Sequence, residues 1–187
     1  MNVLVIFDHP RRDSFCGAVL DSYVKGVEAA GHHADIADLH AEGFDPRMGA
    51  EDEPDWGNAA KQYSPAVLAE QARVDRADAL VFIFPVWWWS FPATTKGWID
   101  RVWNNGWAYG ERKLPHQKAR LVAIAASDAE AFAKRGYDSA IRTQLLTGIM
   151  NYCGIEDNAL DFLHNSLASD DARKELLDTA YQLGLSF

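Results

Sequence analysis

Three short stretches of this chain are almost continuously apolar: residues 2–7 (NVLVIF), 78–84 (DALVFIF) and 119–126 (ARLVAIAA). A strand with one face in water alternates apolar and polar residues, whereas a strand buried on both faces is apolar throughout. Such strands are typical of parallel sheets that helices cover on both sides. This feature therefore predicts an α/β protein built on a buried parallel sheet.

The segments between these strands have helical spacing of apolar residues. We expect two less apolar strands at 33–39 and 153–162, and helices at residues 15–30, 64–76, 93–103, 136–152 and 170–183. Strands that alternate with helices imply right-handed crossovers and a parallel sheet. We find no internal repeat and no linker, so we predict a single domain over residues 1–187. Its expected fold is a flavodoxin-like, doubly wound sandwich with five parallel strands in the order 2-1-3-4-5.

Composition excludes several classes of function. The 187 residues include 27 acidic and 18 basic side chains, a net charge of −9, so the chain lacks the positive footprint of a non-specific nucleic-acid binder. Cys16 and Cys153 form no CxxC pair and the histidines are scattered, so we expect no metal site. No apolar run approaches the roughly 18 residues of a membrane span, and no signal-peptide pattern is present. We therefore expect a cytoplasmic protein without stable membrane insertion.

The topology predicts where a ligand binds. In an open parallel sheet, ligands lie beyond the carboxyl ends of the strands, at the point where strand order reverses. For this strand order, the relevant loops are residues 9–15, 85–92 and 127–137. The long irregular stretch at residues 42–63 is also of a length that is usually functional or mobile.

The first of these loops, HPRRDSFCG, combines a helix start with positive charge. Ser14 is a helix-capping type of residue, and Arg11 and Arg12 are basic in an otherwise acidic chain. Unpaired N–H groups and the positive end of the helix dipole attract anions, so the loop predicts a phosphate or diphosphate site. The alternative is an ordinary capped helix with solvated arginines, with His9 as a turn residue.

The second loop holds three consecutive tryptophans, Trp87, Trp88 and Trp89. Successive extended residues face opposite sides, so the three indoles cannot all enter one core. At this edge of the sheet we expect at least one of them to contact a planar aromatic ligand. The alternative is that two rings pack under the next helix while the third covers an interface. A phosphate at the first loop and a flat ring at the second together predict a flavin nucleotide.

Two long motifs resemble a known family. HPRRDSFCGAVLDSY is similar to the HPxxxSFN-type opening of the flavodoxin-like NAD(P)H:quinone oxidoreductases, the group that includes DT-diaphorase, and FPVWWWSFPATTKGWIDRVW resembles their FPxxWxxxPAxxKGWxDRV signature. The resemblance spans nearly the whole chain. It implies a flavoenzyme that accepts a hydride from NADPH or NADH at flavin N5. By a ping-pong mechanism, it would then pass two electrons to a quinone or a related acceptor.

The resemblance also implies which residues bind the cofactor. Those that match positions near the diphosphate and ribityl chain are His9, Ser14 and Phe15, and we add Arg11 for its positive charge and Cys16 for its place where the family has Asn. Those expected around the flavin ring are Pro85, Val86, Trp87, Trp88 and Trp89. Arg173 and Leu177 match positions near the adenosine half of FAD, which favours FAD over FMN.

Substrate contacts follow from the same resemblance. The expected residues are Trp88, Trp89, Phe132 and Tyr109, with Tyr109 supplied by the other subunit of a homodimer.

The loop after the fourth strand departs from the family pattern. The family has TTGG followed by a Tyr and a His, whereas this chain has AASD at residues 125–128, then Phe132 and Tyr137, and no histidine. The Tyr–His pair that stabilises negative charge at flavin N1–O2 therefore does not carry over. We expect a substitute from the Ser127 hydroxyl and from the backbone N–H groups of Ala126, Ser127 and Asp128.

Three side chains have two interpretations each. Tyr137 is either a substitute proton donor or a packing residue at a helix start. Asp128 either places a carboxylate near flavin N1, which would lower the flavin potential, or caps a short helical turn. Cys16 stands where the family has Asn, and an inert, half-buried thiol is favoured over a reactive one at a helix start.

Two further classes of function remain as alternatives to the homodimeric reductase. Some relatives with similar motifs are regulatory ancillary subunits of potassium-efflux antiporters, with reductase activity as a secondary trait. In that hypothesis the acidic residues 51–55 form a docking surface, although such a loop is more often simply solvated. The other alternative is a one-electron flavodoxin carrier, which the aromatic loop and the reductase motifs disfavour. The altered loop after the fourth strand also leaves open a chain that kept the fold and lost the activity.

Overall fold

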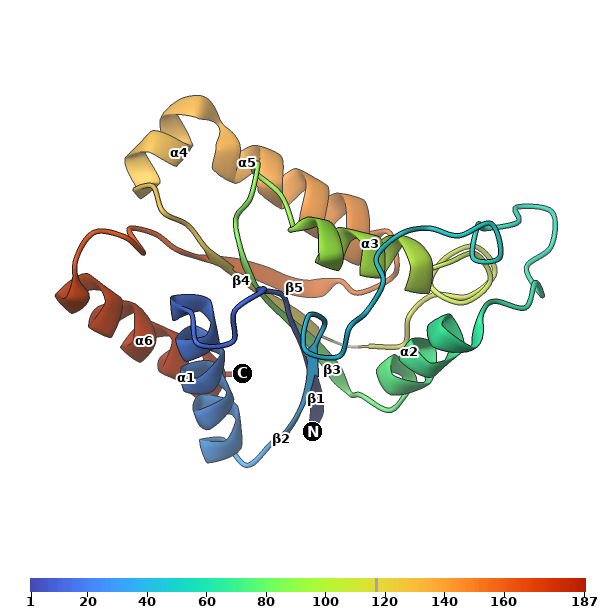
Figure 1. Cartoon of the computed structure of the whole chain (residues 1–187), viewed down its shortest axis with the longest axis horizontal. Helices are drawn as coiled ribbons and strands as arrows, with labels where there is room; N and C mark the ends of the chain where they lie inside the picture. The colour runs from blue at the N-terminus through green and yellow to red at the C-terminus, as the bar shows by residue number, and fades with distance from the viewer. Residues whose placement is uncertain (117) are drawn as a thin grey trace.

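The computed structural model describes residues 1–116 and 118–187. Its sheet is parallel throughout and runs β2-β1-β3-β4-β5 (Figure 1). The strands are β1 (Asn2–Phe7), β2 (His33–Asp38), β3 (Ala79–Pro85), β4 (Lys118–Ile124) and β5 (Asp157–Leu163). The expected flavodoxin-like fold and strand order are confirmed. The three apolar runs form the three central strands, since only these have a strand on each side and helices over both faces.

Helices cover both faces of this sheet. On one face, α1 (Phe15–Ala29) and α6 (Asp170–Leu185) pack on alternate residues of the central strands (Figure 1). The opposite face is covered by α2 (Pro65–Asp75), α3 (Ala93–Val102), α4 (Ala129–Arg135), α5 (Tyr137–Arg142) and a π-helical segment, η1 (Thr143–Asn151). In the part of the chain that the structure describes, no helix is long and apolar enough to cross a membrane.

A close approach of α1 and α6 requires glycine at their crossing. A Cβ built on Gly26 would lie 2.2 Å from the carbonyl oxygen of Tyr181, and one on Gly184 would lie 2.1 Å from that of Tyr23. The two glycines therefore let the helix backbones touch. This contact holds α6, and the segment that precedes it, against the first helix of the fold.

Three element boundaries differ from the sequence-based expectation. Residues 127–137 were expected as a loop, but they contain α4, which Asp128 caps and which Gly136 ends with a φ of +69°. The helix expected over residues 136–152 is instead α5 followed by η1. The last strand begins at Asp157 rather than at residue 153, because Gly154, with a φ of +96°, makes a turn first.

The irregular stretch at residues 42–63 is anchored by a buried ion pair. Asp52 is fully buried, and its Oδ2 lies 2.6 Å from Nη2 of Arg101 on α3. The amide and the hydroxyl of Ser64, the residue that caps α2, donate further hydrogen bonds to this carboxylate. Asp52 is therefore unavailable to the acidic docking surface that was an alternative for residues 51–55.

Candidate functional site

The segments that follow β1, β3, β4 and β5 enclose a cavity of about 260 Å³ at the carboxyl edge of the sheet. We call it the edge cavity. The predicted cofactor-binding residues that line it are His9, Arg11, Ser14, Phe15, Cys16, Pro85, Val86, Trp87 and Ala126. Sequence reasoning missed three other lining residues, Ile124, Ser166 and Leu167. The last two lie three and four residues after β5, whose carboxyl end faces the same edge, and this position was the available signal.

At the first loop, the structure separates the two arginines. Arg11 is exposed and lines the edge cavity, whereas Arg12 pairs with Asp21 of α1 and donates to the carbonyl oxygen of Gly17. Ser14 caps α1 by accepting a hydrogen bond from the Gly17 N–H at 3.3 Å. Arg11 is therefore the side chain that brings positive charge to this end of the cavity.

His9 is fixed beside both loops. The backbone N–H of Arg11 lies 3.0 Å from its Nδ1, and its ring centroid lies 6.1 Å from that of Trp87. The first loop thus folds back on itself and brings the imidazole next to the tryptophan loop.

Cys16 lies at the start of α1 on the wall of this cavity. Burial raises the pKa of its thiol to about 12, and the charge of Arg11 only partly opposes this effect. The thiol is therefore protonated near neutral pH, in agreement with the inert cysteine that was favoured.

The tryptophan loop is a tight turn in an unusual conformation. The Ser90 N–H donates to the carbonyl oxygen of Trp87 at 3.2 Å, and Trp88 and Trp89 between them have φ values of +50° and +60°. Residues other than glycine rarely adopt this left-handed backbone region, which costs roughly 1–3 kcal/mol per residue. The conformation sends the three indoles to three different places.

Each indole has its own environment. Trp87 lines the edge cavity, and Trp88 is 93% exposed. Trp89 stacks on Tyr137, with ring centroids 3.7 Å apart and planes 14° apart, and meets the edge of Phe132 at 5.5 Å. The three rings do not share one core, as expected, but the reason is the tight turn with positive φ at Trp88 and Trp89 rather than the alternation of extended residues. Of the three, only Trp87 is placed to contact a ligand inside the edge cavity, whereas Trp88 stands outside it.

A second hollow, of about 330 Å³, opens beside α4. It is lined by Trp89, Ser127, Ala131, Phe132, Arg135 and Tyr137, and we call it the α4 hollow. The structure thus brings together both predicted catalytic residues, Ser127 and Tyr137, and two of the predicted substrate contacts. Two segments of the chain contribute to each hollow: residues 85–87, 124 and 126 line the edge cavity, and residues 89 and 127 line the α4 hollow.

Asp128 has its capping role. Its Oδ1 accepts a hydrogen bond from the Ala131 N–H at 2.7 Å, and the residue lines neither hollow. The carboxylate therefore belongs to the start of α4, and the interpretation as a helix cap is the one that the geometry supports.

The loop after β4 contains no histidine, but a histidine from another segment lies beside it. His164, which directly follows β5, has its Nδ1 3.1 Å from the carbonyl oxygen of Ser127 and its ring 4.8 Å from that of Phe132. The Asn165 N–H, 3.3 Å from the same oxygen, also donates to it. Sequence reasoning dismissed His164 as one of several scattered histidines, although its place at the end of a strand was a usable signal.

Asp8, directly after β1, is another residue that the sequence did not single out. It is fully buried, and its Oδ2 accepts hydrogen bonds from the N–H and the hydroxyl of Thr95, at 2.7 and 2.6 Å. Pro92 gives α3 no side-chain cap, so Asp8 serves the first turn of this helix from a different strand. His40 Nε2 lies 2.8 Å from the other carboxylate oxygen. The hydrogen bonds from Thr95 join the end of β1 to α3, the helix that begins just after the tryptophan turn.

The two residues predicted on α6 differ in their distance from the edge cavity. Arg173 Nε donates to the carbonyl oxygen of Ser166, which lines the cavity, at 3.1 Å. Leu177, one turn further along α6, is half-buried against α1, and its carbonyl oxygen accepts a hydrogen bond from Ser22. Arg173 thus lies beside the cavity, and Leu177 belongs to the packing of the two helices.

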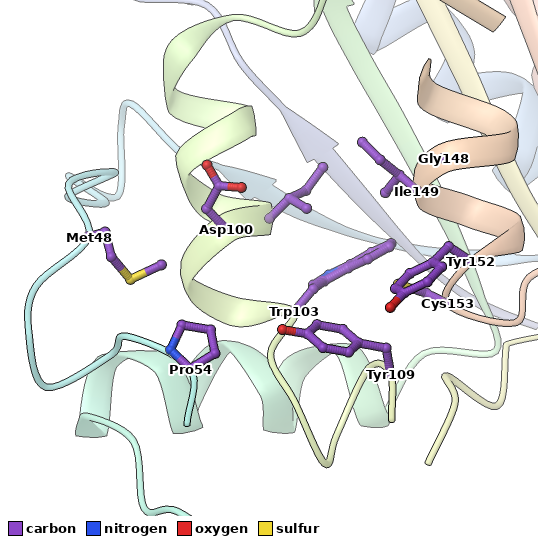
Figure 2. Close-up of a pocket in the computed structure, with 10 residues that line it drawn as sticks. Met48, Pro54, Asp100, Trp103, Tyr109, Gly148, Ile149, Tyr152 and Cys153 are labelled. Carbon is purple, nitrogen blue, oxygen red and sulfur yellow. The ribbon is translucent and has the colours of Figure 1, made fainter. Parts of the chain in front are cut away.

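Tyr109 lies in a third hollow, separate from the other two. This hollow, of about 370 Å³, lies between α3, η1 and the long loop, and its lining includes Met48, Pro54, Trp103, Tyr109 and Tyr152 (Figure 2). The ring of Tyr109 is 5.7 Å from that of Tyr152 and 5.6 Å from that of Trp56. None of these aromatic residues lines the edge cavity or the α4 hollow within the same chain.

A sequence model of the flavodoxin-like fold family matches residues 1–183 of this chain. The chain belongs to this family. Two relatives of this chain are named as enzymes. The uncharacterized NAD(P)H oxidoreductase YcaK of Escherichia coli is 40% identical over 185 residues, which cover 98% of this chain and 93% of YcaK. Human ribosyldihydronicotinamide dehydrogenase (quinone) is 30% identical over 94% of this chain and 87% of its own length.

A solved structure agrees with these relatives. NAD(P)H:quinone oxidoreductase from Methanothermobacter marburgensis matches the flavodoxin-like chain with a TM-score of 0.95 and 31% identity, over 100% of this chain and 96% of that one. The predicted resemblance to NAD(P)H:quinone oxidoreductases is therefore confirmed. The names of these relatives give no support to the antiporter-subunit alternative.

Proposed function

We propose that this chain is a flavin-dependent NAD(P)H oxidoreductase that reduces quinones or related two-electron acceptors in a ping-pong cycle. One observation carries the proposal: a single cavity at the carboxyl edge joins Arg11 and the start of α1 to the indole of Trp87. A bound flavin would supply hydride acceptance at N5 and the return of two electrons to an acceptor. The residues of the chain bind, orient and shield it.

The cavity fits the two chemically different halves of a flavin nucleotide. At one end, the first turn of α1 presents backbone N–H groups beside the Arg11 guanidinium, which suits a phosphate or diphosphate. At the other end, Pro85, Val86 and Trp87 offer a wall suited to a planar ring. The buried Cys16 thiol stays protonated and so adds no negative charge beside the anion.

We assign Ser127 and Tyr137 to the N1–O2 edge of the flavin ring, where reduction adds negative charge. The hydroxyl of Ser127 and the backbone N–H groups of Ala126, Ser127 and Asp128 would stabilise that charge, and Tyr137 would donate a proton. Stacking on Trp89 keeps the Tyr137 ring in one orientation. Capping holds the Asp128 carboxylate at the start of α4.

We further propose FAD as the flavin and a homodimer as the active form. Arg173 supports FAD because it reaches Ser166 at the wall of the edge cavity. Exposed aromatic residues support the homodimer, since Trp56 is 75% exposed beside Tyr109 and Tyr152 is 55% exposed. In such a dimer, Tyr109 of one subunit would complete the acceptor site of the other, together with Trp88, Trp89 and Phe132.

The test is an absorbance spectrum of the purified protein, repeated without oxygen after NADPH is added. Flavin bands that bleach with NADPH and return with a quinone would support the proposal, and mass analysis of the released cofactor would distinguish FAD from FMN. Bands that bleach with neither NADPH nor NADH would favour an electron carrier. If no flavin is bound and none can be reconstituted, the proposal is wrong.

A variant tests the cavity itself. Arg11→Gln should weaken flavin binding to the apoprotein, measured by quenching of flavin fluorescence, by about tenfold, because it removes one charge-assisted contact to phosphate. Arg76→Gln is the control, since Arg76 is also exposed but lies at the amino edge beside Asn2 and His33. Equal affinities for the two variants would contradict the assignment of the phosphate end.

A further inference from the structure

We propose that the α4 hollow binds the electron acceptor and that Arg135 makes it selective for planar aromatic acceptors with an anionic substituent. This inference rests on the proposed reductase function and names the class of acceptor. It starts from the shape of the hollow. The Trp89 and Tyr137 rings lie parallel, and the ring of Phe132 stands nearly perpendicular to both, at 78° and 85°. Trp89 and Tyr137 stack on each other with centroids 3.7 Å apart, and Phe132 is only 2% exposed, so this stack is the aromatic wall that the hollow offers to a flat ligand.

The charge in the hollow comes from one residue. Of the residues that line it, only Arg135 is formally charged. Among residues 1–116 and 118–187, no carboxylate lies within ion-pair distance of its guanidinium. Its one hydrogen bond there is a long one, 3.4 Å from Nη1 to the carbonyl oxygen of Ala131. The other N–H groups of the guanidinium are therefore available to a ligand.

The acidic side chains nearest to Arg135 in the sequence are not part of the hollow. Asp128 is engaged as the cap of α4, and Glu130 and Asp138 are not part of the lining of the hollow. The chain as a whole has a net charge of −9, which repels anions at long range. An unpaired arginine against an aromatic wall is thus a local exception. Its planar fork matches a carboxylate, sulfonate or phosphate group.

A simpler explanation exists for a basic residue at this position. Arg135 lies in the last turn of α4, where any positive charge interacts favourably with the helix dipole. Lys134 lies in the same turn and has the same charge and a similar exposure, but it does not line the hollow. Helix stabilisation predicts that the two residues behave alike, whereas acceptor selectivity predicts that only Arg135 matters.

The experiment compares two acceptors that differ in one group: a neutral methylnaphthoquinone and a naphthoquinone sulfonate. The kcat/KM for each is measured for the wild-type holoenzyme and for Arg135→Gln, Arg135→Lys and Lys134→Gln. We expect Arg135→Gln to lower the sulfonate-to-neutral ratio by about five- to tenfold, the range of one exposed charge-assisted contact. Arg135→Lys should restore part of the ratio, and Lys134→Gln should leave it unchanged.

Binding is also measured without turnover. Naphthalene sulfonate, which the enzyme cannot reduce, is titrated calorimetrically into the same proteins at low and high salt. We expect it to bind more weakly to Arg135→Gln than to Lys134→Gln, and the difference should shrink at high salt.

Three outcomes would overturn the inference. In the first, the ratio is unchanged in Arg135→Gln. In the second, it falls equally in Lys134→Gln. In the third, Arg135→Gln lowers kcat/KM for NADPH rather than for the sulfonate, so that the guanidinium serves a phosphate of the donor. If the wild type reduces neither quinone, the proposed function fails, while the naphthalene sulfonate titration still tests the hollow.

Discussion

The buried pair of Asp52 and Arg101 should decide whether the long loop stays folded on α3. The Asp52 carboxylate is fully buried and accepts hydrogen bonds from the Ser64 N–H at 2.9 Å and from its hydroxyl at 3.0 Å. Arg101 donates from Nη2 at 2.6 Å and from Nε at 3.2 Å. The side chain of Arg101 is itself only 9% exposed. Because both side chains are buried, water cannot take the place of either partner.

Asp52→Asn removes the negative charge and keeps the shape. The guanidinium of Arg101 would remain buried without a counter-charge. The N–H groups of the new amide would face the N–H donors of Arg101 and Ser64. Removal of one partner of a buried ion pair costs about 3–5 kcal/mol. At roughly 2–4 °C per kcal/mol for a domain of this size, the Tm should fall by about 6–20 °C. Asp45→Asn, in the same loop but exposed and paired with Arg47, should change the Tm by only about 2 °C.

The effect should also depend on pH in one direction. Burial raises the pKa of Asp52, but hydrogen bonds from Arg101 and Ser64 lower it by more, so its pKa is below its usual value. The contribution of Asp52 is therefore present above the pKa of the unfolded chain and is lost as the pH falls through the lower, folded value. The stability gap between wild type and Asp52→Asn should be constant near neutral pH and shrink below about pH 4.

The assay is thermal and urea unfolding, followed by far-ultraviolet circular dichroism at neutral and acid pH. The double variant Asp52→Leu with Arg101→Met should be more stable than Asp52→Asn, because it buries no uncompensated charge. The reasoning is refuted if Asp52→Asn and Asp45→Asn lower the Tm equally, or if the gap widens in acid. Met48 and Pro54 of the same loop line the Tyr109 hollow, so that hollow should lose its shape with the pair.

Three further predictions concern single positions. Gly97→Ala should lower the free energy of unfolding in urea by about 1–3 kcal/mol, because a Cβ would lie 2.3 Å from the carbonyl oxygen of Pro46; an unchanged free energy of unfolding contradicts that contact. Iodoacetamide should alkylate Cys16 at least about tenfold more slowly in the folded than in the urea-unfolded protein, by mass spectrometry, since burial raises its pKa to about 12; equal rates refute this. Trp88→Gly should leave the free energy of unfolding unchanged or raise it by up to about 1 kcal/mol, because it relieves a φ of +50° and removes an exposed ring; a less stable variant would show that the ring packs.

The sheet, and the edge of it at which a ligand is expected, were predictable from the sequence. Continuous apolar runs identify β1, β3 and β4 as central strands, since only a strand buried on both faces tolerates them. Strand order then places the loops after these strands at one edge, which is why so many of the predicted cofactor residues line the edge cavity. Capping residues such as Ser14 and Ser64 marked helix starts through local hydrogen bonding.

Short elements were beyond this reasoning. The seven residues of α4 bury only Phe132, so no periodic apolar stripe marks the helix. The last strand is an edge strand with a mixed burial pattern, so its start was placed too early.

Which side chains meet follows only from the packing of the folded chain. Partners such as His164 and Ser127, or Asp52 and Arg101, come from segments that are distant in sequence, and no local signal links them. The same holds for the three tryptophans, because the turn and its neighbours, rather than the residue type, send one to the edge cavity, one to solvent and one to Tyr137. Hydrophobic periodicity and capping act within a few residues, whereas the chemistry of this site depends on contacts that exist only after the strands have paired and the helices have packed.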